Sequence, residues 1–297
     1  MTKPTLRYCP ICGFNDGNLL YDGGRGKKFD IIICTKCGLV YVPNLSHQAG
    51  AYRIRNNEDL SPERIAGVLE SERRAYEMAE RRFKNLDKQA PEVLELNGRM
   101  HDIGASLGLF MNFWHKIGFE VTGCEPDKYY AKIGKKHFGF DIAPCLYEQR
   151  PVEIDAYDLI TICHVLEHVP YPRDILKRIR TELKNGGKLY IEIPQISRPY
   201  SGNLDRFFWV EHLNYFSLNT LDGLLRSEGF RIAKNGELGF FLWAIVEKGP
   251  YECIINDLPL DSPDETLQRV MISMLHHQTR KVKELENKIS DITNESN

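Results

Sequence analysis

The sequence has 297 residues, of which 42% are hydrophobic and 27% are charged, so it has the composition of an ordinary globular protein. The formal net charge of -2 argues against a general electrostatic grip on nucleic acid, which requires a basic face. No apolar run approaches the ~20 residues of a membrane span and no signal-peptide pattern opens the chain, so we expect a cytoplasmic protein.

Residues 1–44 contain two Cys-x-x-Cys-Gly motifs, formed by Cys9 and Cys12 and by Cys34 and Cys37. Twenty-one residues lie between the two pairs, close to the spacing of zinc ribbons. Four thiolates provide closed tetrahedral coordination, which is typical of a structural zinc site. The segment is therefore predicted to be a zinc-ribbon module. Iron in a rubredoxin-like site and unrelated buried cysteines are the alternatives.

Residues 45–90 are polar and charged, and apolar positions recur at helical spacing over 62–86, which predicts a helical linker or lid. Residues 91–250 alternate short apolar segments with helical patterns, as expected for a parallel α/β sheet. Strands are predicted at 92–97 with 101–103, 120–125, 141–143, 157–163, 187–193, 231–237 and 240–248. Helices are predicted at 108–117, 129–137, 171–183 and 220–229.

The first strand of this region runs into a glycine turn at 102–108, and Glu125 ends the second strand 21 residues after Gly104. A glycine turn followed by an acid at this spacing is the arrangement that binds an adenosine-containing cofactor through its ribose hydroxyls. The same turn also fits Gly-x-Ser-x-Gly, the nucleophile elbow of α/β-hydrolases, with Asp174 and His212 available downstream. The acid at Glu125 and the early position of the strand favour the cofactor pocket.

Five motifs in order resemble the class I S-adenosylmethionine-dependent methyltransferases. They are Asp-Ile-Gly-x-x-x-Gly at 102–108, Gly-Cys-Glu-Pro-Asp at 123–127, the segment 157–169, Leu-Lys-Asn-Gly-Gly at 183–187 and Glu-His-Leu-Asn-Tyr-Phe-Ser at 211–217. The resemblance implies a Rossmann-like seven-stranded sheet, S-adenosylmethionine and Zn as cofactors, and the branch of sugar and small-molecule enzymes with a zinc-binding domain in front.

The resemblance also implies roles for individual residues. Glu125 should hold the ribose, Asp102 and Gly104 should line the methionine end, and 145–147 should lie near adenine. The full predicted cofactor set is Asp102, Gly104, Ala105, Ser106, Gly108, Glu125, Pro126, Leu146, His164 and Leu166. Ser106 stands where many relatives carry glycine, and its hydroxyl is a candidate contact for the methionine carboxylate.

Methyl transfer to a hydroxyl or carbon is assisted by a general base, and histidine suits that task. Sugar C-methyltransferases with a front zinc domain carry Tyr-x-Glu-His with the histidine as base. Here the motif reads Trp209-Val210-Glu211-His212, so Glu211 and His212 correspond, and His168 is a second candidate. Such enzymes have a further large C-terminal domain for which this sequence has no room, which weighs against C-methylation. A structural role for either histidine is the alternative.

Aromatic residues surround His212 and either stack on a flat acceptor or anchor the loop in the core: Phe207, Phe208, Trp209, Tyr215 and Phe216. The C-terminal segment 264–297 has apolar residues at alternating four- and three-residue steps, including Met271, Leu275, Val282 and Leu285. This heptad pattern predicts an amphipathic helix that forms a coiled-coil homodimer. A helix folded back on its own domain is the alternative.

The sequence therefore predicts an enzyme that methylates a small molecule, namely a sugar, nucleotide-sugar or glycan hydroxyl, with His212 as base. The alternatives are a sugar C-methyltransferase, an RNA methyltransferase that uses its zinc ribbon to grip nucleic acid, and a non-catalytic scaffold. The net charge and the absence of an Asn/Asp-Pro-Pro-Tyr-type motif after the fourth strand weigh against RNA as a partner. The intact Glu125 and glycine turn weigh against a scaffold.

Overall fold

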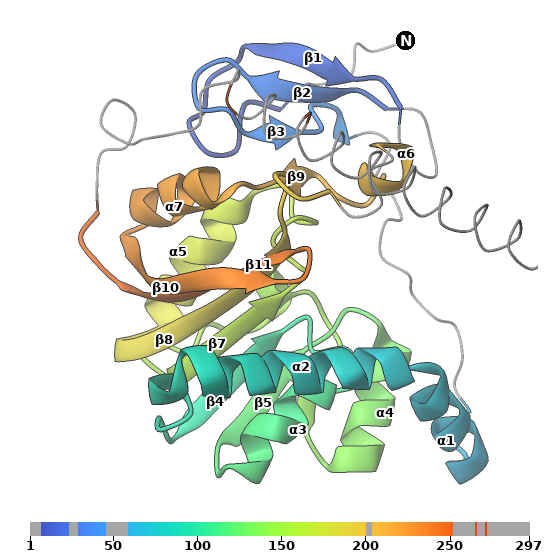
Figure 1. Cartoon of the computed structure of the whole chain (residues 1–297). Coiled ribbons are helices and arrows are strands. Elements are labelled where there is room, and N and C mark those ends of the chain that lie inside the picture. Colours follow the sequence, from blue (N-terminus) through green and yellow to red (C-terminus); the bar gives the residue numbers. More distant parts are fainter. Residues whose placement is uncertain are drawn as a thin grey trace, which may run out of the picture.

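The computed structural model describes residues 7–23, 29–45, 59–199 and 204–251, together with Glu265 and Met271. Seven strands form one sheet in the order β10-β11-β8-β7-β4-β5-β6 (Figure 1). Their bounds are β4 (Arg99–Ile103), β5 (Glu120–Cys124), β6 (Asp141–Ala143), β7 (Tyr157–Cys163), β8 (Leu183–Pro194), β10 (Phe230–Leu238) and β11 (Phe241–Lys248). Strands β4 to β8 run parallel and β11 pairs antiparallel with both β8 and β10. This confirms the predicted Rossmann-like seven-stranded sheet.

Helices cover both faces of the sheet, as Figure 1 shows. One face carries α1 (Pro62–Ser71), α2 (Arg73–Gln89), α3 (Leu109–Lys116) and α4 (Lys128–Phe138), and the other carries α5 (Pro172–Glu182) and α7 (Leu218–Ser227). The short α6 (Leu204–Phe207) lies outside these layers. Because both faces are covered, the central strands read as continuous apolar runs rather than as alternating ones. Leu159, Ile160 and Ile162 of β7 are all fully buried.

Two local predictions were wrong. The predicted helix over 62–86 is two helices, because the backbone of Glu72, with φ -97° and ψ 17°, departs from helical geometry and separates α1 from α2. The predicted strand over 92–97 does not form. The segment instead begins with the 3-10 turn η2 (Pro91–Val93), since proline favours the first position of a helical turn, and only Arg99–Ile103 joins the sheet.

The N-terminal cysteine segment forms a second, smaller sheet in the order β1-β2-β3-β9. Its strands are β1 (Gly17–Tyr21), β2 (Ile31–Cys34), β3 (Val40–Tyr41) and β9 (Asn214–Tyr215). The last strand comes from the segment between β8 and α7, and Val40 pairs with Tyr215 in antiparallel register. The predicted 1–44 module is therefore completed by a strand from the loop that follows His212.

Among the described residues, no helix has the length and apolar character needed to cross a bilayer. The predicted C-terminal helix over 264–297, with its coiled-coil seam, falls outside the described residues except for Glu265 and Met271.

Candidate active site

A cavity of about 210 Å³ opens where β4, β5 and β7 end at their carboxyl termini. Ligands of open α/β sheets bind at this edge, where strand order reverses around the first strand. Ile103, Gly104, Cys124, Glu125, Pro126, Leu146, Tyr147, Glu148, Cys163, His164, Val165, His168, Val169, Ile175 and Glu211 line it. The cavity has two walls. The donor wall consists of residues 103–108 and 124–127, and the acceptor wall consists of residues 163–169 and 211–215.

The glycine turn of the donor wall is held by the backbone of the neighbouring strand. The amides of Gly104 and Ala105 both donate to the carbonyl of Cys124, each at 2.9 Å. Gly104 has φ +77°, and a Cβ there would lie 2.4 Å from Cγ2 of Val165. A side chain at this position would therefore be strained and would close the cavity from the Val165 side.

Ser106 also occupies the left-handed region, with φ +50°, although it carries a side chain. Its amide donates to Oε2 of Glu125 at 2.9 Å, and the amide of Asp127 donates to Oε1 at 2.8 Å. Both carboxylate oxygens of Glu125 are thus oriented by the backbone at the cavity edge. An acid fixed in this way is suited to accept hydrogen bonds from two adjacent ribose hydroxyls.

The predicted cofactor residues divide into two groups. Gly104, Glu125, Pro126, Leu146 and His164 line the cavity. Asp102, Ala105, Ser106, Gly108 and Leu166 are not among its lining residues and support it from behind. Asp102 accepts a hydrogen bond of 2.6 Å from Oγ1 of Thr161, and burial raises the pKa of its carboxyl to about 7. Leu166 is fully buried, and its carbonyl accepts a bond from Asn214.

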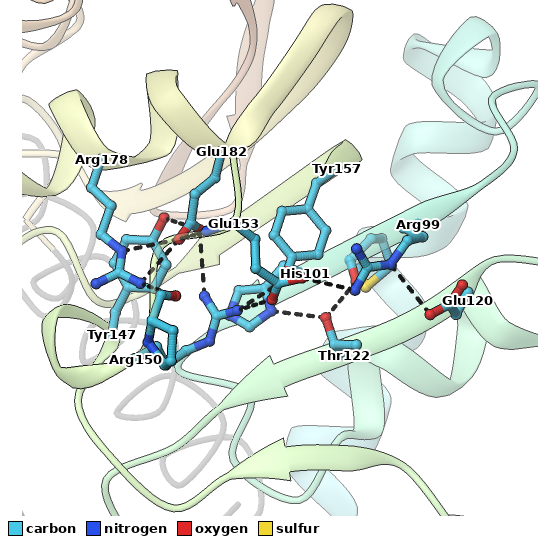
Figure 2. A network of polar contacts seen from close by, with 12 residues as sticks. Arg99, His101, Glu120, Thr122, Tyr147, Arg150, Glu153, Tyr157, Arg178 and Glu182 are labelled. Atoms are coloured by element: carbon cyan, nitrogen blue, oxygen red, sulfur yellow. Dashed lines mark hydrogen bonds and ion pairs between the residues drawn. The ribbon is translucent and has the colours of Figure 1, made fainter. Parts of the chain in front are cut away.

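A polar network behind the cavity fixes Tyr147, the first residue of the 3-10 turn η3 (Tyr147–Gln149) (Figure 2). The Tyr147 hydroxyl donates to Oε2 of Glu182 at 2.7 Å, and the guanidinium of Arg178 lies 4.5 Å from the centre of its ring. Arg150 links Glu182 to the hydroxyl of Tyr157. The ring that lines the cavity is therefore held rigidly, on the side where the resemblance places adenine.

Buried charges form the acceptor wall. His164 directly follows β7 and has φ +55°. Its Nε2 lies 3.0 Å from Oε1 of Glu192, and its Nδ1 lies 3.3 Å from Oε1 of Glu167. Arg82 of α2 reaches the same oxygen of Glu192 at 2.7 Å. Burial works against protonation of His164, but Glu167 and Glu192 outweigh it and raise its pKa to about 9. The wall is thus a chain of alternating charges, and His164 is an imidazolium at neutral pH.

His168 and His212 meet at the end of this chain, with ring centres 4.8 Å apart. Nδ1 of His168 donates to the carbonyl of Glu211 at 2.8 Å, since a carbonyl can only accept. In the neutral ring the lone pair is then on Nε2. His168 lines the cavity, whereas His212 is 5% exposed and lies against Trp209 and Tyr215. Burial lowers the pKa of His212 to about 3, so its ring is neutral at physiological pH.

Sequence reasoning missed Glu167. Its carboxylate and one ring nitrogen each of His168 and His212 lie within 4.8 Å of one another. Although burial opposes ionisation, the three neighbouring histidines, His164 first, lower the pKa of Glu167 to about 2. Its place between His164 and His168 in the sequence was the available signal, because an acid flanked by two histidines after a strand tends to face a site.

The aromatic run anchors the loop in the core. Phe207, Phe208, Tyr215 and Phe216 are at most 2% exposed, and only Trp209 is half-buried beside the two histidines. The hydrolase alternative has no support in the structure. Asp174, its candidate acid, is exposed on α5 and pairs with Lys177, whereas His212 faces Glu167.

The four cysteines of the N-terminal motifs converge, with their sulfurs within 4.8 Å of one another. The Cys9–Cys37 and Cys12–Cys34 sulfur pairs are 3.5 and 3.6 Å apart. Tetrahedral coordination with metal–sulfur bonds of about 2.3 Å places sulfurs about 3.8 Å apart, so the residues fit a bound metal ion. Gly13 and Gly38 have φ +70° and +71°, as two tight turns require.

The match to known families agrees with this geometry. Residues 71–235 match the family model described as a methyltransferase domain, which covers more than half of the chain. The chain belongs to this methyltransferase family, and its seven-stranded sheet is the fold of the class I S-adenosylmethionine-dependent enzymes.

Individual relatives are more distant. The C-methyltransferase NovU of Streptomyces niveus is 21% identical over 250 residues, which cover 75% of this chain and 56% of that protein. A ubiquinone biosynthesis O-methyltransferase of Coxiella burnetii is 31% identical over 138 residues, covering 44% of this chain and 56% of that protein. The chain thus spans about half the length of the curated relatives it matches. A putative S-adenosylmethionine-dependent methyltransferase structure from Listeria monocytogenes aligns with a TM-score of 0.48 and 16% identity, covering 57% of this chain and 99% of that one.

Proposed function

We propose that this protein transfers the methyl group of S-adenosylmethionine to a hydroxyl of a sugar, nucleotide-sugar or glycan, with His212 as general base. The observation that carries the proposal is the contact between two histidines, His168, which lines the cavity that Glu125 also lines, and His212 directly behind it. The sulfonium is already a strong electrophile, so the protein has to align donor and acceptor and accept one proton.

The electrostatics around the histidines suit this role. Burial keeps His212 neutral and therefore ready to accept a proton, but it also weakens the ring as a base. The ionised carboxylate of Glu167 faces both rings and would stabilise an imidazolium as it forms. Glu211 holds His168 through its carbonyl and lines the cavity. His168, whose ring reaches the cavity, is the second candidate base.

The acceptor class rests on the indole of Trp209 and on the relatives. Trp209 is half-buried and makes edge contacts with His168 and His212. An aromatic ring offers an apolar surface on which the apolar face of a sugar ring can pack, while neighbouring polar side chains can bond to the sugar hydroxyls. One curated relative is named as a C-methyltransferase, and another is named as an O-methyltransferase of the biosynthesis of a small molecule, ubiquinone.

We infer further that the Cys9–Cys12–Cys34–Cys37 site binds Zn²⁺. All four ligands are sulfur, three of them are at most 2% exposed, and the module has no disulfide among the described cysteines. A closed site of this kind stabilises a fold and leaves no position for a reactant. Metal analysis of the purified protein, with one zinc per chain expected, tests it.

The proposal is tested with radiolabelled S-adenosylmethionine and a panel of sugar nucleotides. His212→Ala is expected to lower kcat by about 100-fold or more, the usual contribution of a general base, without changing the dissociation constant of the donor. His168→Ala measures the second candidate in the same assay. His137→Ala, on the exposed end of α4, is the control. Unchanged turnover in both variants would exclude the histidine pair as base.

Transfer to carbon is the second candidate function. The alignment with NovU covers three quarters of this chain, and Glu211 and His212 match the Glu-His of the C-methyltransferase motif. Carbon-13 from a labelled donor distinguishes the two outcomes, because a methoxy carbon and a C-methyl carbon resonate in different regions of the NMR spectrum.

A further inference from the structure

One buried arginine joins the cysteine module to both histidine-bearing segments. Arg7, two residues before Cys9, is 8% exposed. Its guanidinium donates to the carbonyls of Val42, Pro170 and Leu213 and to the side-chain oxygen of Asn214. One side chain therefore spans the module, the loop after β7 and the loop after β8.

The contacts of Asn214 extend this link. Its side-chain amide donates to the carbonyls of Leu166 and Val169 at 3.3 and 2.8 Å. The backbone amides of Leu213 and Asn214 both donate to the carbonyl of Glu167. His168 is thus enclosed by fixed carbonyls at Leu166, Val169 and Pro170, and His212 directly precedes the anchored Leu213.

The module contributes backbone as well. The amide of Val42 donates to the carbonyl of Leu213 at 3.0 Å, and β3 pairs with β9. The loop that carries Glu211 and His212 therefore runs directly into β9, the edge strand of the cysteine module, and the end of the loop is held by that module.

We infer that Arg7 is a positioning residue: it fixes the positions of His168 and His212 relative to each other and makes the cysteine module a part of the active site. The inference rests on the proposed function of the two histidines. Reacting groups need near-attack geometry, and a misplacement of about 1 Å costs about 100-fold in rate. An arginine that satisfies four acceptors on three segments fixes that geometry, and lysine, with a single point of charge, cannot replace it.

Arg7→Ala and Arg7→Lys are the test variants, and Arg173→Ala is the matched control. Arg173 is a second arginine bridge, from α5 to the carbonyl of Ile11 in the module and to Glu228, but it does not contact either histidine loop. For Arg7→Ala we expect kcat to fall about 100-fold, the donor dissociation constant to stay within about twofold and zinc content to stay at the wild-type level. Guanidinium added to Arg7→Ala should restore part of kcat, which a general loss of structure would not allow.

A second measurement needs no acceptor. In protein labelled with carbon-13 at histidine, the imidazole resonances of His168 and His212, assigned from His168→Gln and His212→Gln, should move in Arg7→Lys and on removal of zinc by a chelator. They should not move in Arg173→Ala. Unmoved resonances in the Arg7 variants, or an equal loss of kcat in Arg173→Ala, would overturn the inference. If His168→Ala and His212→Ala both retain turnover while these resonances move, the proposed base is wrong and the link through Arg7 remains.

Discussion

The two walls of the cavity are built in different ways. The donor wall joins neighbouring strands of one sheet, and backbone amides orient both Glu125 and the glycine turn. The acceptor wall joins two segments that are far apart in the chain, and buried ion pairs and the side chain of Arg7 hold it together. The first wall depends on local backbone geometry, whereas the second depends on charges and on the correct docking of a separate module.

The largest expected effect is on the donor wall. Gly104→Ala introduces a Cβ 2.4 Å from Cγ2 of Val165 and a side chain at φ +77°, which alone costs about 1–2 kcal/mol. Together, the clash and the backbone strain should raise the donor dissociation constant, measured by calorimetry, about 100-fold. Adding Val165→Ala to this variant should restore the donor affinity that is lost through the clash. Gly139→Ala is the control, since Gly139 has φ +78° but no atom within 4 Å of its Cβ, and it should leave donor binding unchanged.

The second effect also concerns the donor wall. Glu125→Gln keeps the shape of the side chain but removes the charge that we propose accepts hydrogen bonds from the ribose hydroxyls. A charge-assisted hydrogen bond contributes about 1.5–3 kcal/mol, so the donor dissociation constant should rise about 30-fold. Glu120→Gln, at the exposed opposite end of β5, is the control. Equal affinity in the two variants would contradict the ribose-binding role of Glu125.

Glu167→Gln tests whether the acceptor wall affects turnover independently of donor binding. The substitution removes the negative charge that faces His164, His168 and His212. We expect kcat to fall about tenfold, because the imidazolium formed in the reaction loses its stabilising partner, while donor affinity is retained. Glu228→Gln removes a comparable buried carboxylate that pairs with Arg173 outside the cavity, and it should retain kcat. A fall in donor affinity with Glu167→Gln would mean that the two walls are not independent.

The smallest effect is the response of the acceptor wall to pH. Despite burial, Glu167 and Glu192 raise the pKa of His164 to about 9, above its value of about 6.5 in an unfolded chain. The stabilisation is therefore complete below about pH 6.5 and is lost as the pH rises through about 9. Urea unfolding should show a loss of about 1–2 kcal/mol between pH 7 and 9. His164→Gln should not show the loss of unfolding free energy that is due to His164. Identical pH profiles of unfolding free energy in the two proteins would exclude a contribution from His164.

The contrast between the walls also explains what the sequence could predict. The strands β6 and β7, the glycine turn and Glu125 were located because each depends on residues close together in the chain. The histidines at 168 and 212 were chosen as candidates from their motifs, but their contact through Glu167 was not foreseen. Nothing local indicates that a carboxylate after β7 will face a ring 45 positions later, and only the packed structure brings them together.

The same limit applies to the cysteine module. The convergence of its four cysteines follows from two short motifs with a known spacing, so it could be predicted. Its last strand and Arg7 could not. Arg7 bonds to acceptors 163 and 206 positions further along the chain, and β9 has only two residues, too few to show an alternating pattern. The predicted boundary of the module at residue 44 therefore leaves out β9, which belongs to the same small sheet.

The pairing of β3 with β9 has a consequence for synthesis of the protein. Because Val40 and Tyr215 are partners, the small sheet cannot close until most of the chain has left the ribosome. At about 5–20 residues per second this delay lasts about ten seconds or longer, and during it β3 has no partner on its outer edge. The edge of β3 therefore stays open to pairing with other strands during that interval.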